Sequence, residues 1–181
     1  DLEILAKKRV PKMFFDYVNS GSWTETTYNE NVSDFQKIKL RQRVAIDMSN
    51  RTIETKMINQ PVSMPVAIAP TGLTGMQRAD GEILAAQAAE EFGIPYTLST
   101  MSVCSIETVA EKTKKPFWFQ LYVMKDKKFM ERLIDRAKEA RCSALVLTLD
   151  LQLLGQRHKD LRNGLSTPPK LIPKHIYQVL T

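Results

Sequence analysis

Short apolar runs alternate with amphipathic stretches through the middle of the chain. The apolar runs lie at 65–69, 95–98, 117–123 and 144–149, and each predicts a β-strand. The run at 65–69 is bounded by prolines and contains no polar residue, which is typical of a strand buried on both faces of a sheet. The pattern therefore predicts four strands separated by other structure.

Residues at helical spacing, or with helix-starting signals, follow the first three runs. Three helices are predicted in this way, over 82–92, 105–110 and 127–140. Ser105 and Asp126 stand where a side-chain oxygen caps a helix, and Gly93 stands where a helix ends. We expect the Gly-containing stretch 71–81 to be a loop. The order strand, loop, helix is that of βα units, whose parallel strands need right-handed crossovers. A doubly wound sheet and a (β/α)8 barrel both satisfy it.

The N-terminal flank has a different, mixed pattern. Pro11 fits the first position of a helix over 12–19, and Gly21 supplies a stop. Further along, alternating residues predict β-type pieces around 43–46 and 52–57.

After Asp150 the chain becomes irregular and basic, and Pro168, Pro169 and Pro173 indicate a long loop. We therefore divide the chain into a helical segment with a β-type lead-in at 1–60, βα units at 61–150, and a basic, mobile active-site loop at 151–181.

Composition narrows the class of protein. The 181 residues are 43% hydrophobic and 25% charged, which excludes a disordered or collagen-like chain. The net charge of +6 comes from basic residues dispersed among acids, so we predict a slightly basic surface and no nucleic-acid partner. No apolar run is long enough to span a membrane. Cys104 and Cys142 are too few for a disulfide framework, which indicates a reducing, cytoplasmic compartment.

Candidate chemistry gathers where the predicted strands end. The strand ends carry Pro70, Thr71, Gly72, Ser99, Gln120, Tyr122, Thr148 and Asp150. Active sites of parallel α/β proteins form at the carboxyl ends of their strands. Each polar group taken singly is explained by a bond to neighbouring backbone or water, but together they suggest a bound, flat, polar ligand. Phosphate-loop and dinucleotide fingerprints are absent, and His158 and His175 lack metal-ligand spacing, so we assign no metal.

Several segments, in order, resemble the FMN-dependent 2-hydroxy-acid dehydrogenases and oxidases. They are 11–17, 64–72, 97–100, 118–122, 147–150 and 154–157. The stretches 98–104 and 118–123 are most similar to the bacterial L-lactate dehydrogenases of this family. The resemblance implies a (β/α)8 TIM barrel with FMN at the carboxyl ends of its strands. This chain would supply about the first four βα units after the N-terminal helical segment.

The resemblance also implies roles for individual residues. The backbone of Pro70, Thr71 and Gly72 would border the flavin, and Ser99, Gln120 and Thr148 would hydrogen-bond its polar edge. Tyr17 and Arg157 would contact the substrate carboxylate, Tyr122 would bind the substrate hydroxyl, and Asp150 would support a catalytic histidine. That histidine, a flavin-binding lysine and the phosphate site lie later in the family pattern, and neither His158 nor His175 has the required context.

Two positions depart from the family pattern. Many relatives have Ala where Gly72 stands, and the smaller residue leaves room above the flavin for a broader substrate range. Gln152 replaces a proline that usually follows the aspartate, which changes the expected path of that loop.

The implied activity is oxidation of L-lactate to pyruvate, with electrons passed to a quinone or cytochrome. Two alternatives stay open: oxidation of glycolate or another 2-hydroxy acid with oxygen, and a non-catalytic half-barrel that needs a partner chain. We expect the C-terminal half of the barrel as a partner, a homo-oligomer, and a cytoplasmic location or a peripheral one on the inner face of the cell membrane. We also expect the 181-residue piece alone to be inactive.

Overall fold

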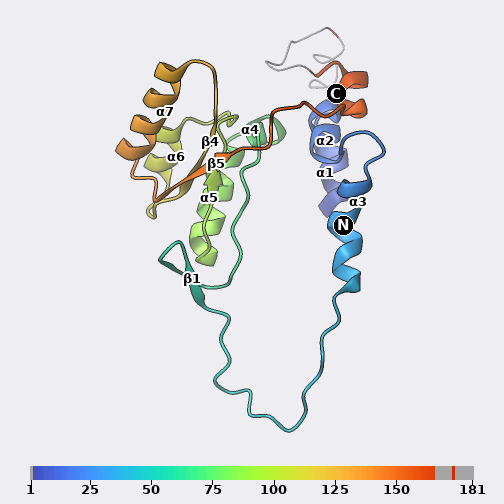
Figure 1. Cartoon of the computed structure of the whole chain (residues 1–181), viewed down its shortest axis with the longest axis vertical. Helices are drawn as coiled ribbons and strands as arrows, with labels where there is room; N and C mark the ends of the chain where they lie inside the picture. Colours follow the sequence, from blue (N-terminus) through green and yellow to red (C-terminus); the bar gives the residue numbers. More distant parts are fainter. Residues whose placement is uncertain (1, 166–172, 174–181) are drawn as a thin grey trace. The chain divides into compact units, whose positions relative to one another are not determined.

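The computed structural model describes residues 2–165 and 173, and its chain forms two compact units (Figure 1). The helical unit comprises Asp1–Met48 and Leu153–Thr181, and the sheet unit comprises Ser49–Gln152. Residues 166–172 and 174–181, including Pro168, Pro169 and His175, lie outside the described residues.

The described part of the helical unit contains α1 (Leu2–Arg9), α2 (Lys12–Val18), α3 (Thr26–Lys37) and α8 (His158–Asn163). The helix predicted after Pro11 is confirmed as α2, which buries Met13 and Phe14. The expectation of irregular chain after Asp150 is wrong at α8, which packs against α2 and ends at Gly164 with φ 71°. A six-residue helix with few apolar positions leaves little periodic signal in the sequence.

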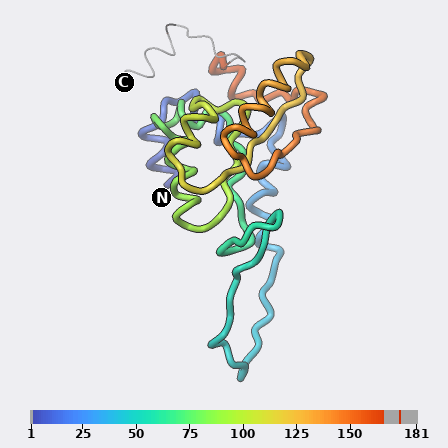
Figure 2. Tube along the Cα trace, turned by 90° about the vertical axis from the view of Figure 1, so that its left-hand side faces the viewer, coloured from blue at the N-terminus to red at the C-terminus, as the bar shows by residue number. Residues whose placement is uncertain are grey.

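The sheet unit contains two sheets joined by helices. Its elements are β1 (Thr55–Met57), β2 (Gln60–Val62), α4 (Thr74–Gln77), α5 (Gly81–Phe92), β3 (Thr97–Leu98), α6 (Ile106–Lys112), β4 (Trp118–Tyr122), α7 (Lys127–Glu139) and β5 (Ala144–Thr148). β1 and β2 form an antiparallel hairpin, whereas β3, β4 and β5 are parallel and adjacent in chain order. Figure 2 shows the Cα trace of this unit from α5 (green) to β5 (orange).

The strand order favours a barrel over a doubly wound sheet. Ile68 forms a parallel bridge with Tyr96, so the sheet continues on the other side of β3 in chain order. A doubly wound sheet reverses its strand order at a switch point, whereas barrel strands follow one another around the axis. Within residues 2–165, the parallel strands follow one another without such a reversal.

The core of the sheet unit lies between the parallel strands and α5, α6 and α7. Leu98, Phe119 and Leu121 are at most 3% exposed, and they cluster with small and branched residues of the three helices. The predicted helix signals are confirmed. The Ser105 hydroxyl accepts from Thr108 N–H at 3.0 Å, the Asp126 carboxylate accepts from Phe129 N–H at 3.0 Å, and Gly93 has φ 73°.

Three local expectations are wrong. Residues 43–46 form no strand, and Ala45 has φ 56°. The expected strand at 65–69 contributes only the bridge at Ile68, because the prolines at both ends cannot donate to a ladder. The stretch 71–81, expected to be a loop, contains α4.

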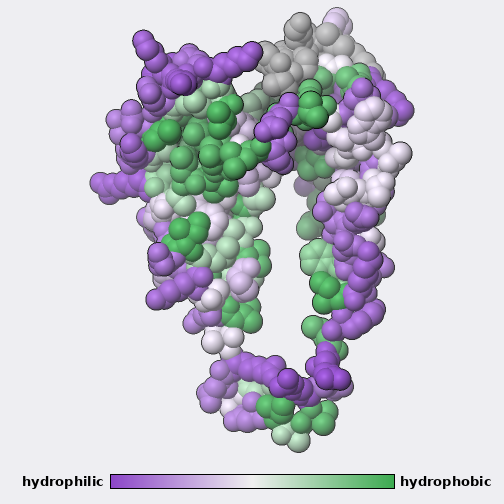
Figure 3. Space-filling view, viewed as in Figure 1, coloured by the Kyte–Doolittle hydropathy of each residue, from purple (hydrophilic) through white to green (hydrophobic). Residues whose placement is uncertain are grey.

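One face of β5 is uncovered in the described chain. Leu145 and Leu147 are 48% and 49% exposed, whereas their register partners Phe119 and Leu121 are buried beneath helices. Figure 3 shows hydrophobic residues gathered on the visible face of this unit. Leu145 and Leu147 lie on the face that carries helices over β3 and β4.

Residues 2–165 and 173 contain no helix that is both long and apolar enough to cross a membrane.

An ion pair joins α6 to α7 and predicts a pH dependence. Arg136 donates to both carboxylate oxygens of Glu107, at 2.7 and 2.8 Å, and this lowers the pKa of Glu107 to about 2. The pair therefore stabilises the fold above the ordinary pKa of 4.5, and that contribution is lost as the pH falls towards 2. Arg136→Met should lower the free energy of unfolding at neutral pH by roughly 0.2–1 kcal/mol, since both side chains are partly exposed.

Urea unfolding of Arg136→Met at several pH values measures this effect, and Lys138→Met on the same helix is the control. The difference between Arg136→Met and the native chain should shrink below pH 4.5. An equal difference at every pH would contradict the assignment.

Candidate functional site

A row of polar side chains crosses the carboxyl ends of three parallel strands. Gln120 stands at its centre and is 1% exposed. Its amide nitrogen donates to the Thr148 hydroxyl at 2.8 Å, and its amide oxygen accepts from Ser99 Oγ at 3.4 Å and from Thr100 N–H at 3.2 Å. Ser99 Oγ also accepts from Met101 N–H at 3.0 Å. The structure therefore brings together the three side chains predicted to bind the polar edge of a flavin.

The alternation of side chains along β4 explains this placement. Phe119 and Leu121 point to the helix-covered face and join the core, so Gln120 and Tyr122 lie on the opposite face. Tyr122 pairs in register with Thr148, which puts the amide of Gln120 diagonally beside that threonine. A buried amide is costly unless it is bonded, and here neighbouring strands supply its partners.

Thr100 belongs to the same row, although the family resemblance assigns it no role. Its hydroxyl donates to the backbone carbonyl of Gln120 and accepts from Tyr122 N–H at 3.3 Å. Thr100 thus connects the end of β3 to β4 at the level of the candidate site. The only sequence signal for it is its place directly after Ser99 at a strand end.

The loop that follows Ile68 lies beside the loop that follows β3. Leu73 N–H donates to the Met101 carbonyl at 2.9 Å, and the Thr74 hydroxyl donates to the Thr71 carbonyl at 3.1 Å. Pro70 and Thr71 are exposed and Gly72 is half-buried. Backbone at 70–72 is therefore available at the same end of the sheet as the polar row.

The two other candidates of the sheet unit lie at strand ends. Tyr122 is the last residue of β4 and is half-buried. Asp150 follows β5 by two residues and is exposed. Their places fit the expected end of the sheet, and their roles stay predictions.

Tyr17 and Arg157 meet within the helical unit. The Arg157 guanidinium lies 4.7 Å from the centre of the Tyr17 ring and donates to the Tyr17 backbone carbonyl. It also donates to Ser20 Oγ at 3.2 Å and forms an ion pair with Asp160 at 2.8 Å. Two residues 140 positions apart are thus held in contact, as their predicted shared role requires.

Two half-buried carboxylates, Asp160 and Asp16, belong to the same unit as this pair. Burial raises the pKa of Asp160, although the Arg157 charge opposes the rise, and Asp16 adds to it. Burial acts in the same direction on Asp16, but hydrogen bonds from Lys12 and Asn163 and the Lys12 charge leave its pKa below the ordinary value. Asp160 therefore pairs with Arg157, and Asp16 lies close enough to Asp160 to raise the pKa of that carboxyl.

The polar row fits the edge of an isoalloxazine ring. That edge carries carbonyl oxygens and ring nitrogens that need both donors and acceptors. The two hydroxyls of the row can each act as a hydrogen-bond donor or acceptor, and the amide has a donor nitrogen and an acceptor oxygen. Among residues 2–165 and 173, no group of three or more His, Cys, Asp or Glu side chains could hold a metal ion.

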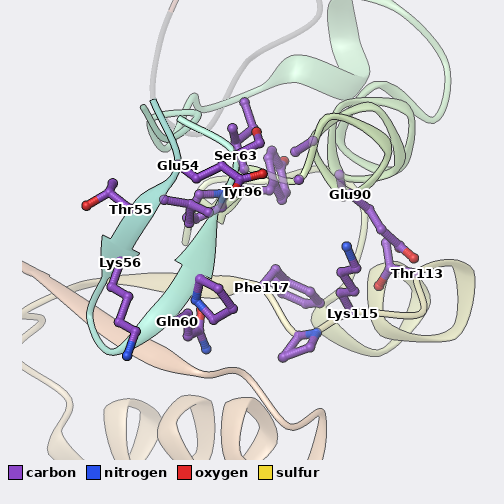
Figure 4. Close-up of a pocket in the computed structure, with 18 residues that line it drawn as sticks. Glu54, Thr55, Lys56, Gln60, Ser63, Glu90, Tyr96, Thr113, Lys115 and Phe117 are labelled. Carbon is purple, nitrogen blue, oxygen red and sulfur yellow. The ribbon is translucent and has the colours of Figure 1, made fainter. Parts of the chain in front are cut away.

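A large cavity lies elsewhere in the sheet unit. It has a volume of about 960 Å³ and is lined by the β1–β2 hairpin, the end of α5, and Tyr96 and Phe117 where two strands begin (Figure 4). Because Tyr96 and Phe117 precede β3 and β4, the cavity opens at the amino ends of the strands. Active sites in parallel barrels form at the opposite ends, so we do not place the site there.

Comparison with known proteins agrees with this geometry. The chain belongs to the FMN-dependent dehydrogenase family, whose sequence model matches residues 6–181. The parallel sheet and this family together confirm the fold class: the chain carries the first strand–helix units of a (β/α)8 barrel.

An L-lactate dehydrogenase of Acinetobacter baumannii is 47% identical over 179 residues, which are 99% of this chain and 47% of that protein. The monotopic membrane protein (S)-mandelate dehydrogenase is 34% identical with a TM-score of 0.88, over 97% of this chain and 47% of that one. A soluble mutant of the membrane-associated (S)-mandelate dehydrogenase from Pseudomonas putida is 36% identical with a TM-score of 0.86, over 96% of this chain and 50% of that one. The chain thus spans about half the length of these relatives.

Proposed function

We propose that this chain supplies one half of the active site of an FMN-dependent dehydrogenase that oxidises L-lactate to pyruvate. The observation that carries the proposal is the hydrogen-bonded row of Ser99, Gln120 and Thr148 across adjacent parallel strands in a chain of this family. The 47% identity to an L-lactate dehydrogenase, against 34% and 36% to two mandelate dehydrogenase structures, favours lactate as the substrate.

The residues of the sheet unit hold the cofactor in this proposal. FMN, when bound, accepts the two electrons that leave the substrate. Ser99, Gln120 and Thr148 bind the polar edge of its ring, and the backbone of Pro70, Thr71 and Gly72 borders it.

Three further side chains bind the substrate, and a fourth orients the general base. The Arg157 guanidinium binds the substrate carboxylate by charge-assisted hydrogen bonds, and Tyr17 lies beside it. The Tyr122 hydroxyl binds the substrate hydroxyl. The Asp150 carboxylate orients a histidine that acts as general base and comes from polypeptide outside this chain.

The partners follow from the same proposal. Because the chain spans about half of its relatives, the second half of the barrel supplies the histidine, and the chain alone has no turnover and binds FMN weakly. A quinone or cytochrome takes the electrons, and the protein forms homo-oligomers. A peripheral place on the inner face of the membrane is supported by the likeness to membrane-associated mandelate dehydrogenase.

Anaerobic flavin spectroscopy of the complete protein tests the proposal. The protein should bind FMN and show the visible absorbance of an oxidised flavin, and L-lactate should bleach that absorbance within one turnover, with pyruvate formed in equal amount. Glycolate and (S)-mandelate are the comparison substrates. A flavin that stays oxidised with lactate would contradict the substrate, and a protein that binds no FMN would favour the non-catalytic half-barrel.

A second candidate is an oxidase that acts on glycolate or a longer 2-hydroxy acid and passes electrons to oxygen. Gly72 favours the longer 2-hydroxy acids, because a residue without a side chain leaves space above the ring for a larger substrate. Peroxide yield compared with dye reduction, measured for each substrate, separates the two candidates.

A further inference from the structure

Glu82 is a fully buried acid that the proposed mechanism does not use. It lies in the first turn of α5, its side chain is 0% exposed, and it touches neither the polar row nor Tyr122 in any described contact. Charged side chains are almost never fully buried unless partners satisfy them.

One carboxylate oxygen of Glu82 holds the start of α4, which continues the loop at 70–73, and the loop after β3. Glu82 Oε1 accepts from Gly75 N–H at 2.9 Å and from Val103 N–H at 3.0 Å. Gly75 is three residues beyond Gly72, and Val103 is four residues beyond Ser99. The two loops that carry candidate cofactor-binding residues are therefore tied to the same atom.

The space around Gly75 shows how closely the loops approach. A Cβ at Gly75 would lie 2.6 Å from Val103 Cβ and 2.8 Å from Glu82 Oε2. Only a residue without a side chain fits between the two loops without moving them. This steric fact is independent of the hydrogen bonds and points to the same fixed spacing.

The charge of Glu82 is stabilised where it lies. Burial by itself raises the pKa, but the N–H groups of Val103 and Gly75 outweigh it, and the pKa of Glu82 lies below the ordinary value. The start of α5 adds a favourable helix dipole. The Cys104 thiol lies close to the carboxylate, and burial together with the negative charge of Glu82 raises the thiol pKa to about 11.

We propose that Glu82 is a positioning residue that fixes the spacing between the segment 70–75, which runs into α4, and the loop 99–103, and so shapes the flavin site without touching the flavin. The inference rests on the proposed function. It predicts that loss of the Oε1 acceptor separates the loops and weakens FMN binding, whereas loss of the charge alone has little effect.

Three variants of the complete protein and one matched control test the inference. Glu82→Leu removes both acceptors, Glu82→Gln keeps an oxygen for the two N–H groups, and Gly75→Ala pushes the loops apart without changing a charge. The control is Glu90→Leu on the same helix, because the Glu90 carboxylate also binds a backbone N–H, that of Lys114 at 2.8 Å, near the amino ends of the strands.

The readouts are the dissociation constant of FMN, the visible circular dichroism of the bound flavin, and amide exchange of Gly75 and Val103 in the apoprotein. Glu82→Leu and Gly75→Ala should weaken FMN binding at least about tenfold, which corresponds to roughly 1.4 kcal/mol. They should also speed exchange at both amides. The FMN dissociation constant of Glu82→Gln should stay within about threefold of that of the native protein. Glu90→Leu should lower thermal stability and leave FMN affinity unchanged.

Native FMN affinity in a folded Gly75→Ala or Glu82→Leu protein would overturn the inference. Equal weakening by Glu90→Leu would also overturn it, because the effect would then be general destabilisation. A native protein that binds no FMN would refute the proposed function instead, and amide exchange would still decide whether Glu82 holds the loops. If Glu82→Leu fails to fold, Gly75→Ala and Glu82→Gln carry the test.

Discussion

Gln120→Leu should weaken FMN binding by the complete protein by roughly ten- to a hundredfold and lower its free energy of unfolding by about 2–4 kcal/mol. Leucine has a similar volume but cannot bond, so it leaves Thr148 Oγ1, Ser99 Oγ and Thr100 N–H without their partner. Each buried polar group that loses its bond costs about 1–3 kcal/mol. FMN affinity follows from flavin fluorescence quenching, and stability from urea unfolding of the apoprotein.

The control for Gln120→Leu is Gln87→Leu on α5. Gln87 is exposed and its amide donates to the Lys112 carbonyl at 2.9 Å, away from the polar row. Gln87→Leu should lower the free energy of unfolding slightly and leave FMN affinity unchanged. A Gln120→Leu protein that is destabilised but binds FMN as tightly as the native protein would show that the row is structural only.

Arg157→Met should lower kcat/KM for L-lactate by roughly a hundred- to a thousandfold. Removing one member of a buried, charge-assisted pair costs about 2–5 kcal/mol, and each 1.4 kcal/mol is a factor of ten. Methionine retains the length and apolar packing of the arginine stem, but it loses the charge and the donors to Tyr17 and Ser20. Steady-state kinetics with L-lactate and a dye acceptor measure the effect.

Arg162→Met is the matched control, because Arg162 lies exposed on the last turn of α8. Its kinetics should match those of the native protein. Arg157→Lys should recover part of the loss, since lysine keeps the charge but not the paired donors. If Arg157→Met had the native KM for L-lactate and only a lower free energy of unfolding, the role of Arg157 would be limited to holding α2 against α8.

The sequence predicted most of the sheet unit because its signals are local. Helix caps at Ser105 and Asp126, the stop at Gly93 and the apolar run around Phe119 each depend on a few neighbouring residues. The polar row was foreseen because polar side chains at the ends of parallel strands must meet at one edge. The resemblance to a family then supplied the roles, which geometry alone does not give.

Features that depend on distant neighbours were missed or changed. Nothing in the sequence separates Glu82 from an exposed acid at the start of a helix, because its burial comes from loops that begin elsewhere. Of the strand expected at 65–69, only the bridge at Ile68 forms, because strand pairing depends on a neighbouring strand as well as on apolar residues. The helix α8 is stabilised by packing on α2, which no local pattern records.

The helical unit is built from two segments that are far apart in the sequence, Asp1–Met48 and Leu153–Thr181. This separation affects the order in which contacts can form during folding. Each parallel pair of the sheet unit joins strands close in sequence, as in Thr97 with Trp118 and Trp118 with Ala144, so this unit closes only short loops. Contacts between α2 and α8 need the whole stretch Ser49–Gln152 to be made first. During synthesis, the strands that carry the polar row are therefore complete before α8 is available to pack on α2.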